Sequence, residues 1–122
     1  MSENKEYITQ IQENGRVMIS EEVIITIALQ SLTDIEGFVS LSSKPGSDII
    51  DMIGKRNWGK GIKATISDND EITIDCNVII NYGQSVVTVA KNIQENITSA
   101  LESTTGAKVL AVNVNVCGIV RK

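Results

Sequence analysis

The stretch from Glu71 to Tyr82 alternates apolar and polar side chains, with Ile79 as the exception, which limits the folds that the chain can adopt. Successive side chains of a β-strand point to opposite faces of a sheet, so the pattern predicts one long strand with an apolar face. That face carries Ile72, Ile74, Cys76, Val78, Ile80 and Tyr82, against Thr73, Asp75, Asn77, Ile79 and Asn81 on the other. The segment Gly61–Ser67 alternates in the same way, and the turn residues Asp68-Asn69-Asp70 join the two. The sequence therefore predicts an antiparallel hairpin whose apolar face needs a cover.

Two helical segments can supply that cover. Ser20 can cap a helix that runs to about Ile35, with acidic residues in its first turn. This segment is apolar on most sides, which indicates a central core helix or a helix with one edge in a subunit interface. Ser85 can cap a second helix that ends at Gly106. Its apolar stripe is Val86, Val89, Ala90, Ile93, Ile97, Ala100, Leu101 and Thr104.

Three further segments have strand-like patterns. Gly15–Ile19 and Phe38–Ser42 are short, and Lys108 to about Val120 is long. The long segment alternates Leu110, Val112, Val114 and Val116 against Ala111, Asn113, Asn115 and Cys117. Residues 43–47 read as a loop, and residues 48–53 as a short helix that stops at Gly54.

These elements predict an α/β fold of the α+β type. The expected architecture is a single two-layer sandwich, in which two long helices pack on one face of a mixed sheet of about four strands. Residues 1–14 are expected to be a flexible N-terminal arm, and residues 15–122 a single domain.

Histidine is absent from the 122 residues. Its absence removes the commonest general base and most zinc sites. The carboxylates of Asp68, Asp70 and Glu71 crowd a turn without the regular spacing of a calcium loop. We therefore expect a protein that is not an enzyme, with no catalytic residue, no cofactor and no metal.

The cysteines and the lengths of the apolar runs indicate in which cellular compartment the protein is found. Cys76 and Cys117 each lie in an alternating run, which favours two buried free thiols in a reducing cytosol over a disulfide or a redox pair. The N-terminal residues have no apolar core for a signal peptide, and no apolar run is long enough to span a membrane. We expect a cytoplasmic protein with no direct membrane insertion, which reaches a membrane only through a partner.

The segment Lys44–Lys63, here called the basic segment, differs in charge from the rest of the chain. Its five basic and two acidic residues give +3, so that the remainder of a chain with net charge −4 carries −7. Within it, GKRNWGKG almost matches a phosphate-binding loop of the form G-x-x-x-x-G-K. However, Gly61 stands where that loop needs Ser or Thr for magnesium, and the stretch precedes a strand instead of a helix. Nucleotide binding is therefore not expected.

Other interpretations of the basic segment stay open. In the first, its side chains contact a partner protein or a second copy, the candidates being Lys55, Arg56, Asn57, Trp58, Lys60 and Lys63. In the second, the segment Lys55–Lys63 binds nucleic acid, with Trp58 stacked on a base. The acidic body and the lack of an aromatic row on the polar strand face make nucleic acid the weaker alternative. In the third, Trp58 covers one end of the core and the lysines are only solvated.

The order of the segments resembles the alkaline shock protein family, the envelope stress response proteins of Gram-positive bacteria. The resemblance is carried by GRVMISEEVI, IGKRNWGKGIKATI, DCNVIINYGQSV, VAKNIQENITSAL and TGAKVLAVNVNVCGIV, and covers residues 15 to 120. The family's Gly-Lys-Lys/Arg-Asn stretch corresponds here to residues 54–57, and its Lys-Gly pair to Lys60 and Gly61.

This resemblance implies a non-enzymatic cytoplasmic protein that self-associates and influences cell-envelope homeostasis. It also implies two kinds of role within the family. Some members are held at the membrane by a small membrane-anchored protein, and others are linked to control of fatty-acid synthesis. A homo-oligomeric scaffold or regulator that binds a partner protein is therefore the leading hypothesis.

Overall fold

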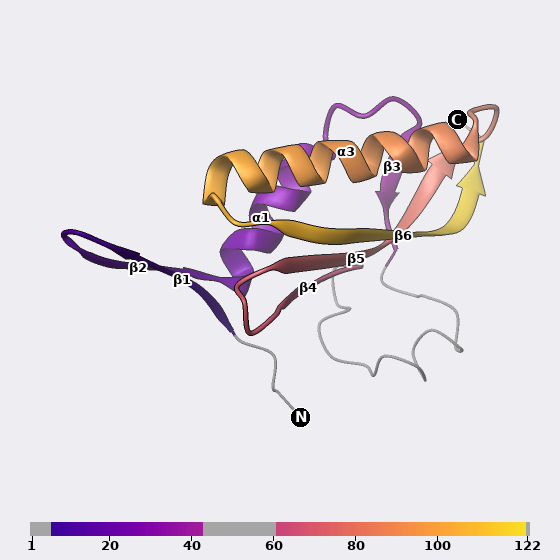
Figure 1. The fold of residues 1–122 in the computed structure, drawn as a ribbon. Helices are drawn as coiled ribbons and strands as arrows, with labels where there is room; N and C mark the ends of the chain where they lie inside the picture. Colours follow the sequence, from indigo (N-terminus) through magenta and orange to yellow (C-terminus); the bar gives the residue numbers. More distant parts are fainter. Residues whose placement is uncertain (1–5, 43–60, 122) are drawn as a thin grey trace.

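The computed structural model describes residues 6–42 and 61–121. Within these residues the chain forms two helices and six strands, arranged in two separate sheets (Figure 1). In chain order the elements are β1 (Tyr7–Gln12), β2 (Gly15–Ser20), α1 (Glu21–Ser31), β3 (Phe38–Leu41), β4 (Ile62–Ile66), β5 (Ile72–Asn81), α3 (Val86–Thr105) and β6 (Val109–Val120). The α+β class predicted from the sequence is confirmed, but one sheet was expected and the described chain has two.

Strand β5 is the centre of the main sheet because both of its edges are paired. Along one edge β6 runs parallel to it over almost its full length. The other edge is shared: β4 pairs antiparallel with the first half of β5 and β3 with the second half. The result is a mixed sheet of four strands, in which α3 connects the parallel strands β5 and β6.

The apolar face of β5 is buried under both helices, as its alternation predicts. Figure 1 shows α1 and α3 on the same side of the main sheet, where α1 packs over β4 and α3 over β6. The two helices also contact each other. The buried side chains that they contribute are Ile24 and Ala28 of α1 and Val89, Ile93, Ile97 and Leu101 of α3.

Local chemistry sets the helix ends. The side-chain oxygens of Ser20 and Ser85 each accept a backbone N–H from the first turn of their helix at 3.3 Å, so both predicted caps are confirmed. Gly106 ends α3 in the left-handed conformation that its lack of a Cβ permits. Helix α1 is shorter than predicted: it ends at Ser31, and a turn occupies the residues up to Ile35.

The predicted apolar rows of β5 and α3 are wrong at three positions near the ends of these elements. Tyr82 lies past the end of β5, where it is exposed and its ring contacts the Arg121 guanidinium at 4.7 Å. Val86, in the first turn of α3, is also exposed. At the other end of α3 the buried residue is Thr105 and not Thr104, because the stripe continues from Leu101 in a step of four.

Residues 7–12 form a strand, so the prediction of a flexible arm is wrong for them. They pair antiparallel with β2 across a two-residue turn, Glu13-Asn14. Ile8 is only 1% exposed and belongs to the main core, which explains why this stretch is ordered. Residues 1–5 lie outside the described part of the chain.

The predicted alternation of β6 is wrong at its beginning. Leu110, expected inside, is 51% exposed, and Val109 is buried instead. The pairing with β5 shifts at this point, from Val109 opposite Ile72 to Ala111 opposite Thr73, so that Leu110 has no partner on β5. Such a bulge changes the face on which the following residues lie. A second shift leaves Cys117 unpaired near the end of the strand.

Three residues, here called the neck, hold together the end of β3 and the beginning of β4. Ser42 N donates to Asn77 O and Asn77 N donates to Gly61 O, both at 2.8 Å. A Cβ built on Gly61 would lie 2.5 Å from Ser42 O. Residues 43–60 run between Ser42 and Gly61, and the loop and short helix predicted there lie outside the described residues.

We expect Gly61→Ala to lower the free energy of unfolding more than Gly83→Ala does. Both glycines have positive φ, +80° and +96°, so each alanine carries a conformational cost of about 1–3 kcal/mol. Gly83 has open space where a Cβ would stand, whereas Gly61 meets the backbone of Ser42. Urea denaturation of the two variants measures the difference, and equal losses would contradict the close approach at the neck.

Candidate functional site: the polar face of the main sheet

The structure places one of the six predicted contact residues. Lys63 lies on β4, directly across from Asp75 of β5, and Asp75 in turn lies across from Asn113 of β6. The other five, Lys55, Arg56, Asn57, Trp58 and Lys60, lie outside the described residues. The interpretations of Trp58 and of the basic side chains around it therefore stay predictions.

Lys63 belongs to a polar face on the side of the main sheet away from the helices. Asn113 Nδ2 donates to Asp75 Oδ1 at 2.9 Å, and Asn115 Nδ2 donates to Asn77 Oδ1 at 3.0 Å. Parallel pairing in register places these residues opposite each other, and the period of two places both pairs on the same face. The sequence shows the polar positions of each strand, but not that β5 and β6 are neighbours, so this pairing was missed.

Asn77 connects the polar face with the neck. Its side chain is fully buried, and Nδ2 has no hydrogen-bond partner in the described part of the chain. Asn81 Oδ1, farther along β5, is also buried without a partner there. The backbone of Asn77 bonds to both Ser42 and Gly61, so Asn77 lies where the polar face meets the neck. The face offers amide and carboxylate groups for hydrogen bonding.

The two cysteines differ in exposure, although both are free thiols. Cys76 is buried on the apolar face of β5, and this burial, with the charge of Asp75 and then Cys117 nearby, raises its thiol pKa from 9.0 to about 12. Cys117 is exposed at the second bulge of β6, so the prediction of a buried thiol is wrong there. Partial desolvation still raises the pKa of Cys117. Both thiols are therefore protonated at neutral pH.

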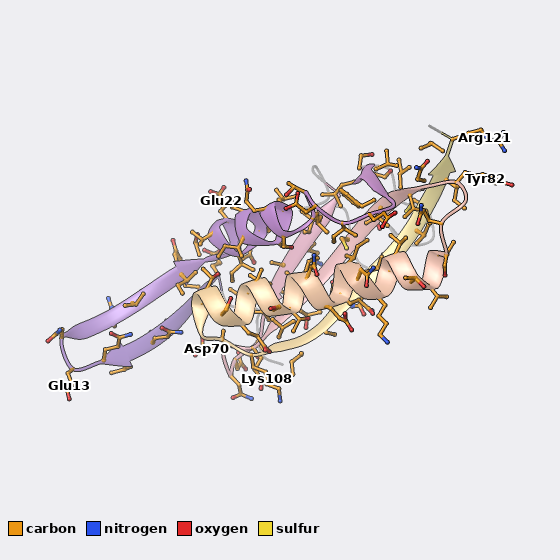
Figure 2. All side chains as sticks on the ribbon, turned by 90° about the horizontal axis from the view of Figure 1, so that it is seen from above. Glu13, Glu22, Asp70, Tyr82, Lys108 and Arg121 are labelled. Atoms are coloured by element: carbon orange, nitrogen blue, oxygen red, sulfur yellow. The ribbon has the colours of Figure 1, made fainter. Side chains whose placement is uncertain are left out.

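A second candidate surface consists of exposed apolar side chains at the two ends of the molecule. Figure 2 shows Glu13, in the turn of the β1–β2 hairpin, at one end, and Tyr82 and Arg121 at the other. The exposed apolar residues of the hairpin are Tyr7, Ile11, Val17 and Met18. Those near the far end are Tyr82, Val86, Val87, Ile119 and Val120. The sequence assigned the first of these groups to a flexible arm and a short strand, and so did not identify it as a surface.

Two negative findings apply to the described ranges 6–42 and 61–121. No group of three or more acidic or cysteine side chains there is placed to hold a metal ion. Neither helix there is long and apolar enough to cross a membrane.

We expect Asn115→Ala to destabilise the fold more than Asn113→Ala. Removing Asn115 takes away the hydrogen-bond partner of the buried Asn77 Oδ1, which costs about 1–3 kcal/mol. The Asn113–Asp75 bond is exposed, so water can replace it and the change stays within about 0.5 kcal/mol. Chemical denaturation of both variants provides the comparison. Similar losses of stability in the two variants would show that the Asn77–Asn115 hydrogen bond contributes no more than the exposed Asn113–Asp75 bond.

The raised pKa of Cys76 predicts a loss of stability in alkali. Between pH 9 and about pH 12 the unfolded chain releases this proton while the folded chain keeps it. In this range the folded state binds more protons than the unfolded state. The free energy of unfolding, which has its full value below pH 9, therefore falls as the pH rises, by up to about 1.4 kcal/mol per pH unit. The variant Cys76→Ala lacks this titration while keeping all the other groups that titrate in this range. The difference in unfolding free energy between wild type and variant should shrink from pH 9 upward, and a constant difference would contradict the assignment.

Comparison with known proteins agrees with the resemblance found in the sequence. Residues 9–121 match the model of the alkaline shock protein 23 family, described as having a cell envelope-related function. No solved structure matches the chain.

Relatives occur in two Gram-positive bacteria. The uncharacterized protein YqhY of Bacillus subtilis is 33% identical over 86% of this chain and 77% of its own length. The uncharacterized proteins Spy1535 and Spy1614 of Streptococcus pyogenes are 34% and 33% identical, over 87% and 88% of this chain and 80% and 89% of their own lengths. The match spans nearly all described elements, from β1 to β6. The chain belongs to the alkaline shock protein family, whose function is related to the cell envelope.

Proposed function

We propose that this protein is a non-enzymatic scaffold or regulator of cell-envelope homeostasis and stress response, which acts by self-association and by binding a partner protein. The observation that carries the proposal is the exposed apolar surface of the β1–β2 hairpin, which projects from the body (Figure 1). Projecting apolar surface is typical of protein–protein contacts. The family's cell envelope-related function supports the part of the proposal that concerns the cell envelope.

The chemistry of the described residues supports a binding role more than a catalytic one. The sequence has no histidine, and both thiols are held in the protonated, unreactive form. On the polar face the side chains of Asp75, Asn77, Asn113 and Asn115 bond to one another. Groups paired in this way suit a preformed docking surface better than a site that moves protons during a reaction.

The uneven charge gives self-association a second source of attraction. A basic segment of +3 and a remainder of −7 can attract each other between copies, which speeds association and favours specific orientations. We place the protein in the cytoplasm and propose a small membrane-anchored protein as the partner that holds it near the membrane. Lys55, Arg56, Asn57, Trp58, Lys60 and Lys63 are the proposed contacts of the basic segment.

We expect charge reversal at Lys55, Arg56 and Lys60, each to Glu, to weaken association without unfolding the domain. The variant loses the attraction between the basic segment and the acidic remainder of a second copy. Light scattering after size-exclusion chromatography, at low and at high salt, measures the effect. The control variant reverses Lys91, Lys108 and Lys122, which changes the net charge equally and leaves the basic segment intact. If the two variants associate alike, the basic segment is only a solvated surface.

The partner is tested by low-salt affinity purification from the native bacterium, with the proteins and the nucleic acid of the eluate examined together. Untagged copies of the chain with a small membrane protein, lost in the basic-segment variant and kept in the control, would support the proposal. Nuclease-sensitive nucleic acid with steep salt dependence would replace it with a nucleic-acid-binding regulator.

A further inference from the structure

The β1–β2 hairpin has a free strand edge, and its direction follows from the hydrogen bonds. Glu21 N donates to Glu6 O at 3.1 Å, and Gln12 pairs with Gly15 at the turn. Even-numbered residues of β1 therefore direct their backbone groups toward β2, and odd-numbered residues direct theirs away. Thr9 N, on the outward side, donates to Asp70 Oδ1 at 3.3 Å.

Asp70 thus occupies the base of the outward edge and leaves the distal part open. The next outward residue is Ile11, whose backbone has no hydrogen-bond partner in the described part of the chain. Its side chain is 80% exposed, the highest value among the exposed large apolar residues described. Figure 2 shows Glu13, in the turn that follows β1, away from Asp70 and from the body of the protein.

The edges of the main sheet are protected against pairing with another chain. β6 carries bulges at Leu110 and Cys117, and Gln94 Nε2 of α3 donates to Val112 O between them at 2.9 Å. On the opposite side of the sheet β3 and β4 are short, and Lys63 lies within β4. Bulges, covering side chains, short strands and lysines are the usual ways to prevent edge-to-edge pairing.

Apart from the contact of Thr9 with Asp70 at its base, strand β1 has none of these protections. Its sequence, YITQIQ, contains no charge, no proline and no glycine, and the structure records a regular register along it. β-branched and aromatic residues make up more than half of it, a composition that favours pairing with a further strand. A two-stranded hairpin is also marginal in water, so that additional strands would stabilise it.

We propose that β1 of one copy pairs antiparallel with β1 of a second copy, centred on Ile11, to form a four-stranded sheet across a two-fold axis. This deepens the proposed function and rests on its self-association. The pairing is self-complementary, because the outward N–H and C=O of Ile11 meet the same groups of the partner. A two-fold interface uses the same edge of both copies and leaves no such edge free for a third copy, so the product is a dimer.

The first test places a charge on the edge. Ile11→Lys should raise the dimer dissociation constant about tenfold or more, since a lysine on an edge strand opposes pairing. Sedimentation equilibrium measures the constant, and circular dichroism checks that the variant is folded. Leu110→Lys is the control, because Leu110 is 51% exposed but lies on β6 of the main sheet.

The second test places a thiol at the two-fold axis, in a Cys117→Ser background. Ile11→Cys should be joined to itself by a short thiol–thiol cross-linker, since directly paired Cα atoms lie about 5.5 Å apart. Val17→Cys, in the same hairpin but on the strand that does not face the partner, should cross-link much less.

The outcomes separate this inference from the proposed function. A wild-type chain that stays monomeric overturns self-association, and with it the pairing of β1. A wild-type chain that associates, with Ile11→Lys unchanged, overturns only the pairing of β1. Loss of association in Ile11→Lys without self-cross-linking of Ile11→Cys overturns the two-fold arrangement.

Discussion

Pairing of β5 along both of its edges is the interaction on which the rest of the structure depends. One strand holds β6 on one side and both β3 and β4 on the other. Its inner face supplies a continuous row of buried side chains to the core beneath α1 and α3. Its outer face supplies Asp75 and Asn77 to the polar face. Since β3 and β4 share one edge, the neck at Asn77 is a direct result of this pairing.

Features that depend on neighbouring residues were predictable from the sequence. The alternation of β5, the caps at Ser20 and Ser85 and the end of α3 at Gly106 are all set by local chemistry, and the structure has them. The candidate site was less predictable, because five of its six proposed residues lie outside the described chain. The polar face depends on β5 and β6 being neighbours, which no local pattern reveals.

The predictions that were wrong also depended on contacts between residues far apart in the sequence. β1 was expected to be part of a flexible arm, because a short uncharged stretch gains order only from distant contacts: Ile8 with the core and Thr9 with Asp70. The exposed Leu110 and Cys117 follow from shifts in pairing with β5 and not from their own sequence context. A strict alternation predicts the face of each residue only while the register is unbroken, and one extra residue inverts it.

The contacts at the base of the β1–β2 hairpin fix its direction relative to the main sheet. Ser20 is both the last residue of β2 and the N-cap of α1, so no linker separates the hairpin from the first helix. At its base Gln10 Nε2 donates to Thr105 O, next to the end of α3, while Thr9 N donates to Asp70 in the turn between β4 and β5. Two attachments and a shared cap fix the direction in which the hairpin projects. A second copy bound at β1 would therefore hold the two main sheets in a defined relative orientation, as a scaffold requires.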